Sequence, residues 1–274
     1  MTERQDFLTA LRGSQPDGAV PIWELEFHAW NSFSCRHVVL GEEFSQLTPG
    51  EQERTLHSNA EIFLQVSKLL HFAALSVPGG FWKIAPGFSA YYWLPEAARL
   101  RQIAILQSLK PANLVLVANS GGVMAMPGAA DYIQFCYDLY EDPQKIEQRA
   151  RQTLADGLEQ ARRLMDLGVE AVFTASDIVD NHGVFFKPTQ LRRFILPYLH
   201  DWAAAVRAMG LYAILHSDGN LNSCLGQIAD SGVHALQAFD PVAGMDMVES
   251  QSPGGRPPDS VRQHRLRLAA YGNA

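Results

Sequence analysis

The chain has 274 residues, of which 47% are apolar and 19% charged, and its formal net charge at pH 7 is −7. That length suits one large α/β domain or two small ones, and the composition is ordinary for a soluble globular protein. The negative charge disfavours nucleic acid as a partner, because binding to it usually needs a basic surface. No apolar run approaches the length of a membrane span and the charged N-terminus has no signal core, so we expect a cytoplasmic protein.

Short apolar runs that are typical of strands alternate along the chain with segments that have helical periodicity. The sequence predicts strands at residues 19–26, 73–77, 113–118, 171–175, 211–215 and 235–238. It predicts helices at residues 51–70, 95–109, 129–140, 143–167, 188–209 and 221–230. This alternation indicates right-handed βαβ units that form a parallel sheet. The aromatic residues between 81 and 93 are expected in a loop, where they either pack or close over a flat ligand.

Six βα units fit either a doubly wound sheet or most of an eight-unit barrel. The first strand is not followed by a glycine-rich phosphate-binding turn, which disfavours a dinucleotide-binding sheet. In both architectures the functional residues gather just after the carboxyl ends of the strands. In chain order, the candidates at these ends are Glu24, Glu26, His28, Trp82, Ser120, Asp177, His216, Asp218, Asn220 and Asp240.

The most specific local pattern is LHSDGN at residues 215–220. His216 and Asp218 are two positions apart, so in an extended segment their side chains point the same way. The pair suits metal binding, or a histidine oriented by a carboxylate for proton transfer. It also suits a structural role, in which Asp218 caps the next helix and His216 only forms a hydrogen bond in the interior. The spacing alone favours neither interpretation.

The other candidates also have two interpretations each. Asp177, together with residues 180–182, could form a second polar wall, although a solvated loop with capping side chains is favoured for Asp180 and His182. Glu24 and Glu26 share one face of the expected first strand. If that face lines a barrel, their mutual repulsion raises one pKa, and if it faces solvent they are ordinary surface acids. The three cysteines, Cys35, Cys136 and Cys224, are too scattered for a disulfide framework or a structural zinc site.

Residues 171–246 contain four features in a fixed order. An aspartate follows the fourth strand, and the next helix opens near a proline and contains Leu-Pro-Tyr. A histidine turn that ends in Gly-Asn comes next, and Gly-Met-Asp follows the strand after it. These residues read SDIVDNHGVFFKPTQLRRFILPYLHDWAAAVRAMGLYAILHSDGN and DSGVHALQAFDPVAGMDM. This series resembles the uroporphyrinogen decarboxylase superfamily, and a looser likeness extends over roughly residues 19–249. The resemblance implies a (β/α)8 barrel whose active site lies at the carboxyl ends of the strands.

The resemblance also implies one of two chemistries. One branch is a lyase of porphyrin metabolism, which decarboxylates uroporphyrinogen without a metal or cofactor and grips its carboxylates with N-terminal arginines. The other branch moves methyl groups between corrinoids and thiols or methyl donors, usually with zinc held by His-x-Cys and a later cysteine. Residues 23–37, where the lyase branch has several arginines, contain a single arginine, Arg36. The acids at positions 24 and 26 would repel a polycarboxylate. The zinc motif is altered to His216-x-Asp218, and aspartate can bind zinc but mimics a thiolate poorly.

We therefore predict an enzyme of metal-assisted methyl transfer linked to a corrinoid. The alternatives are uroporphyrinogen decarboxylation, without a cofactor, and a non-catalytic binding protein or inactive fragment. His216, Asp218 and Asp177 are the predicted catalytic residues, and the first two are the predicted metal ligands, with zinc as the metal. The predicted substrate-binding residues are Glu24, Glu26, His28, Trp82, Ser120, Asn220 and Asp240. The implied partners are a small-molecule substrate, a corrinoid protein and a second copy of the chain.

The C-terminal residues do not fit the expected barrel. An eight-unit barrel needs two more βα units after Asp246, but residues 250–267 are rich in proline, glycine and arginine and contain no apolar strand. Codons that encode residues 261–267 can give Phe-Gly-Asn-Ile-Asp-Cys when read one base later, which resembles the seventh strand of the family. We therefore expect an incomplete barrel of about six units at residues 1–249 and a frameshifted, irregular tail at 250–274.

Overall fold

The computed structural model describes the backbone of residues 2–77, 81–85, 88–92 and 94–246, and the side chains of these residues except 81–92. The expected domain boundary at residue 249 and the tail at 250–274 lie outside the described residues. The chain divides into two compact units. Of the described residues, unit 1 comprises those within 2–10, 14–118 and 164–171, and unit 2 comprises those within 11–13, 119–163 and 172–246.

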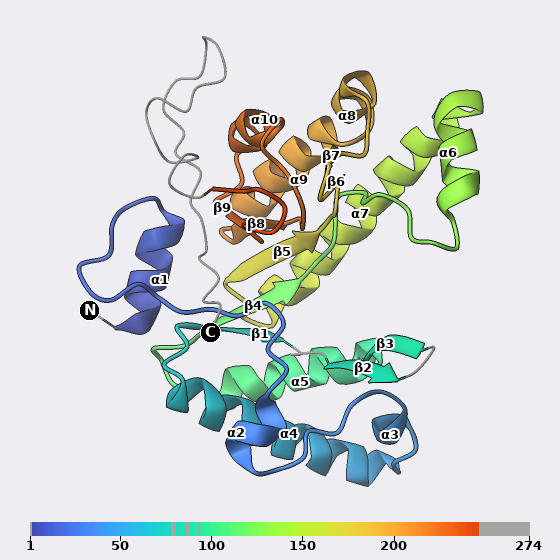
Figure 1. The fold of residues 1–274 in the computed structure, drawn as a ribbon. Coiled ribbons are helices and arrows are strands. Elements are labelled where there is room, and N and C mark those ends of the chain that lie inside the picture. The colour runs from blue at the N-terminus through green and yellow to red at the C-terminus, as the bar shows by residue number, and fades with distance from the viewer. Residues whose placement is uncertain (1, 78–80, 86–87, 93, 247–274) are drawn as a thin grey trace. The chain divides into compact units, whose positions relative to one another are not determined.

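The principal sheet has five strands in the order β1-β4-β5-β8-β9 (Figure 1). They are β1 (Ala74–Val77), β4 (Val115–Asn119), β5 (Ala171–Ala175), β8 (Tyr212–His216) and β9 (Ala235–Gln237). Hydrogen bonds between the β4 and β5 segments occur inside each of the two units. In unit 1, Glu170 N donates to Leu116 O at 3.3 Å, and in unit 2, Ser120 N donates to Phe173 O at 3.0 Å. The order follows the chain without reversal, as in a barrel and unlike a doubly wound sheet. Each of these strands coincides closely with a predicted one.

The helices of unit 1 precede or follow β1. They are α1 (Glu3–Leu11), α2 (Trp30–Ser34), α3 (Gly41–Ser45), α4 (Pro49–Leu69) and α5 (Glu96–Leu109). The longest, α4, begins with a capping box, because Thr48 and Glu51 satisfy each other's backbone N–H groups at its first turn. It buries Leu56, Ile62 and Phe63 and packs against α5. The predicted helices at 51–70 and 95–109 are thus confirmed.

Two expectations for unit 1 are wrong. Residues 19–26 form no strand: Ile22 makes only an isolated parallel bridge to Phe72, and the chain bends at residues 25 and 26. Pro21, which has no N–H to donate to a ladder, precedes this bridge. The aromatic segment expected as a loop instead forms an antiparallel hairpin of β2 (Phe81–Ala85) and β3 (Phe88–Tyr92). Its aromatic residues are ones that favour extended backbone.

Unit 2 holds the remaining elements of the sheet and its helices. The helices are α6 (Tyr132–Glu141), α7 (Pro143–Asp166), α8 (Pro188–Phe194), α9 (Leu196–Ala208) and α10 (Leu225–Asp230). A two-stranded ribbon, β6 (Val179–Asp180) with β7 (Gly183–Val184), follows β5. In Figure 1, α9 packs on β8 and α10 packs on α9. No helix in the described ranges is both long enough and apolar enough to cross a membrane.

The helix predicted at residues 188–209 is in fact two helices. Ile195, with φ −120° and ψ −63°, separates α8 from α9. Pro197 explains the break, because it cannot donate the helical hydrogen bond to the carbonyl four residues earlier and its ring crowds that carbonyl. The last predicted helix begins at Leu225 rather than at 221, because residues 222–224 form a turn.

Candidate functional site

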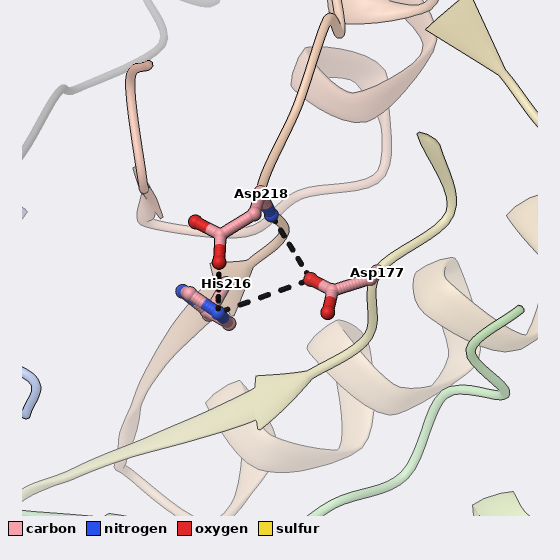
Figure 2. Close-up of side chains that lie close together, drawn as sticks. All are labelled: Asp177, His216 and Asp218. Atoms are coloured by element: carbon pink, nitrogen blue, oxygen red, sulfur yellow. Dashed lines mark hydrogen bonds and ion pairs between the residues drawn. The ribbon is translucent and has the colours of Figure 1, made fainter. Parts of the chain in front are cut away.

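Three of the predicted site residues come together in unit 2. Asp177 follows β5, His216 is the last residue of β8, and Asp218 lies two positions further on. The Nε2 atom of His216 is 3.8 Å from Asp177 Oδ1 and 3.7 Å from Asp218 Oδ2. Figure 2 shows both carboxylates turned toward the imidazole. The histidine side chain is 12% exposed and those of Asp177 and Asp218 are 42% and 66% exposed, so the cluster opens to solvent on its acidic side.

Backbone hydrogen bonds fix the two loops that carry these side chains. Asp218 N donates to Asp177 Oδ1 at 2.9 Å (Figure 2). On the other side of Asp177, Ile178 N donates to the buried hydroxyl oxygen of Ser217 at 3.2 Å. Ser176 N donates to the carbonyl of His216 at 2.9 Å, which continues the β5–β8 ladder. The loop after β5 is therefore bonded to the loop after β8 at three consecutive residues.

The turn after Asp218 needs glycine at position 219. Gly219 has φ +104°, and a Cβ atom there would lie 2.6 Å from the backbone oxygen of Asp180. Asn220 N donates to that same oxygen at 2.8 Å. The β6–β7 ribbon thus packs directly against the turn, and this contact sets the direction in which the chain leaves Asp218.

Asp180, which was considered for a polar wall beside Asp177, has a structural role in its turn. Asp180 Oδ1 accepts hydrogen bonds from the backbone N–H groups of His182 and Gly183, at 2.7 and 3.1 Å. This carboxylate closes the tight turn of the ribbon, as short acidic side chains do in turns.

The other predicted residues of unit 2 hydrogen-bond to nearby backbone. The hydroxyl of Ser120 donates to Gly121 O, Asn220 Oδ1 accepts from Asn222 N, and Asp240 Oδ1 accepts from Val242 N. These bonds stabilise the turns after β4, β8 and β9. A role of these residues in substrate binding stays a prediction.

Four predicted substrate-binding residues belong to unit 1. Burial raises the pKa of the half-buried Glu24, and the cause is desolvation rather than the repulsion by Glu26 that was considered for a barrel-lining strand. Glu26 and His28 are exposed, and Oε2 of Glu26 lies 4.0 Å from Nε2 of His28. Trp82 lies in β2, and its side chain is outside the described residues.

Gln237 is a neighbour of His216 that the sequence reasoning missed. Its side chain is buried, and its Oε1 atom lies within hydrogen-bond distance of Nδ1 of His216. The two residues are register partners in the parallel β8–β9 pair. The available signal was a polar residue at the end of a buried strand, adjacent to the strand that delivers the histidine.

The donor atoms of Asp177, His216 and Asp218 fit a divalent metal ion. One donor atom from each residue lies within 4.8 Å of the other two. Two ligands at about 2.0–2.2 Å from a tetrahedral zinc lie about 3.3–3.6 Å from each other, close to the His216–carboxylate distances. A set of one imidazole and two carboxylates is also chemically suitable for zinc, and it extends the predicted pair of ligands to three.

The cysteine nearest in sequence to this cluster is not a suitable ligand. Cys224 is buried, its thiol contacts Leu221 O at 3.4 Å, and burial raises the pKa of the thiol to about 12. Since the thiolate is the form that binds metals, this side chain stays protonated at neutral pH. The aspartate at position 218 is therefore not compensated by a thiolate from Cys224.

The comparisons with known proteins agree with this fold. Residues 114–252 match the family model described as uroporphyrinogen decarboxylase (URO-D). Among solved structures, a methyltransferase from Methanosarcina mazei aligns at TM-score 0.62 and 16% identity, over 86% of this chain and 75% of that one. At this identity the likeness concerns the fold alone. A search of curated proteins found no match.

Two further solved structures align more weakly with the chain. A xylose isomerase-like TIM-barrel protein from Mycobacterium smegmatis aligns at TM-score 0.37 and 13% identity, over 78% of this chain and 63% of that one. A chitinase from Chromobacterium violaceum also aligns at TM-score 0.37 and 13% identity, over 72% and 56% of the two chains. Both scores are too low to support an argument about function.

Proposed function

Because the chain belongs to the uroporphyrinogen decarboxylase family, we propose that it is a metal-dependent methyltransferase of that family. Asp177, His216 and Asp218 would hold the metal, with zinc as the expected ion. The observation that carries the proposal is the convergence of one imidazole nitrogen and two carboxylate oxygens within 4.8 Å at the ends of two adjacent strands.

The metal, when bound, would act as a Lewis acid that stabilises the anionic form of a methyl acceptor such as a thiol. The chain's own residues have distinct parts in this scheme. The two carboxylates contribute two negative charges, which balance a divalent cation. Since Asp177 and Asp218 are also the more exposed members of the cluster, a small substrate can approach from their side.

A corrinoid carried by a partner protein is the proposed methyl carrier. This part of the proposal rests on the family resemblance of residues 171–246. The small-molecule substrate would be the methyl donor or acceptor. A homodimer and a cytoplasmic location stay predictions.

Decarboxylation of uroporphyrinogen has less support. Arg36, the single arginine of residues 23–37, forms an ion pair with Glu61 at 3.0 Å and donates to the Ser58 hydroxyl at 3.0 Å. Its guanidinium is thus already engaged by an acid of the same chain.

The test is metal content by mass spectrometry on the purified full chain, beside His216→Ala and Asp218→Asn. The matched control is Asp180→Asn, which changes a nearby acid that closes a turn. We expect about one zinc per chain in the wild type and the control, and substoichiometric zinc in the two site variants, because each of them lacks one of the proposed ligands. Folding of each variant is checked by circular dichroism.

Activity is then measured as methyl transfer from methylcobalamin to a thiol, with uroporphyrinogen decarboxylation as the second assay. Zinc-dependent methyl transfer that disappears in His216→Ala supports the proposal. Metal-free protein that decarboxylates uroporphyrinogen overturns it in favour of the lyase branch. Folded protein that binds no metal and shows neither activity indicates a non-catalytic binding protein.

A further inference from the structure

In the described part of the structure, the side chain of Gln237 forms a hydrogen bond with the ring of His216. Its side chain is buried at the end of β9, and the β8–β9 register places it beside the histidine. We propose that Gln237 is a positioning residue that selects the tautomer of His216 with hydrogen on Nδ1, so that Nε2 presents its lone pair to the metal. This inference rests on the proposed function for the identity of the bound metal. The tautomer itself can be measured in the metal-free protein.

The atoms in contact determine which tautomer is favoured. The Oε1 atom of glutamine only accepts hydrogen bonds, so the Nδ1 atom that faces it must donate one. In a neutral imidazole with hydrogen on Nδ1, the Nε2 atom carries a free lone pair. Metal-binding histidines commonly donate their other ring N–H to such an acceptor, which fixes both the tautomer and the ring orientation.

The distances on the other side of the ring agree with this assignment. Nε2 lies 3.7–3.8 Å from the two carboxylate oxygens, whereas a direct charge-assisted hydrogen bond would be about 2.7–2.9 Å. The imidazole is therefore bonded on its Nδ1 side, and a gap separates Nε2 from Asp177 and Asp218. A histidine that served as the partner of a catalytic carboxylate would show the reverse pattern.

The direct test is the histidine tautomer in the metal-free full chain, measured by long-range ¹H–¹⁵N correlation NMR in a buffer basic enough to keep histidine rings neutral. His216→Gln identifies the resonances. We expect hydrogen on Nδ1 in the wild type and in Gln237→Glu, which keeps an acceptor oxygen at that position. In Gln237→Leu, which has no acceptor, we expect this preference to be lost.

Zinc affinity is measured on the same proteins, with Gln102→Leu as the matched control. Gln102 is also a buried glutamine, and its amide donates to Leu56 O at 2.8 Å, remote in sequence from the histidine. Both leucine variants should lose stability, but only Gln237→Leu should bind zinc about 10–100-fold more weakly. If Gln237→Leu fails to fold, the wild type and Gln237→Glu still decide the tautomer.

The outcomes separate this inference from the proposed function. Hydrogen on Nε2 in the metal-free wild type overturns the role of Gln237, and so does an unchanged tautomer in folded Gln237→Leu. A chain that binds no zinc, yet has hydrogen on Nδ1 that depends on Gln237, supports the positioning role and refutes the metal proposal. Hydrogen on Nδ1 in the wild type, together with a zinc affinity that falls in Gln237→Leu but not in Gln102→Leu, supports both the positioning role and the metal site.

Discussion

The substitution Gly219→Ala tests whether the turn after Asp218 is locked against the β6–β7 ribbon. The new Cβ would lie 2.6 Å from the backbone oxygen of Asp180 and 2.7 Å from its carbonyl carbon. These are backbone atoms, which cannot rotate away as a flexible side chain would. The φ of +104° adds strain, because residues with a side chain rarely adopt it.

The expected cost follows from these two contributions. Backbone strain of this kind costs about 1–3 kcal/mol, and forced overpacking adds about 1–3 kcal/mol. The free energy of unfolding should therefore fall by about 2–6 kcal/mol. Gly210→Ala is the matched control, since Gly210 has φ +81° but nothing within 4 Å of its Cβ position, so only the strain of about 1–3 kcal/mol applies.

Urea denaturation of the two variants beside the wild type measures this difference. Zinc affinity is the second readout, because relief of the contact with Asp180 should displace Asp218 and weaken binding in Gly219→Ala alone. A Gly219→Ala protein that is no less stable than Gly210→Ala and binds zinc as the wild type does would refute the reasoning.

Further predictions concern groups at and beyond the site. Ser217→Ala should lower the free energy of unfolding by about 1–3 kcal/mol in denaturant titrations, because the buried N–H of Ile178 loses its acceptor; a change within about 0.5 kcal/mol would contradict this. Because burial raises the pKa of Glu24, its protonated form is favoured in the folded state, and its contribution to stability is lost as the pH rises from 4.5 through the raised value. Glu24→Gln should therefore be more stable than the wild type at neutral pH and lose that advantage below pH 4.5, which denaturation across this range measures. Iodoacetamide with peptide mass spectrometry should label the exposed Cys35 in the native protein and Cys224 only after unfolding; equal labelling rates would show that Cys224 is accessible.

Much of the principal sheet was predictable from local sequence. Strands in a parallel sheet are buried on both faces, so they read as continuous apolar runs that need no knowledge of their neighbours. The strand at 171–175 was predicted with the bounds that the structure has. The segment at 19–26 contains apolar residues as well, but it also contains Pro21 and two glutamates, and the structure leaves it with one bridge.

The residues of the candidate site also differ in how far the sequence could predict them. His216 and Asp218 were found together because they are two residues apart, and local backbone geometry alone brings their side chains to one side. Asp177 is 41 residues from Asp218, and Gln237 is 21 residues from His216, so only strand pairing could bring them together. The sequence by itself therefore determined the five strands of the principal sheet and the His-x-Asp pair, because their causes are local. The tertiary structure decided the third donor and the acceptor behind the histidine, because contacts between distant residues depend on the register of neighbouring strands.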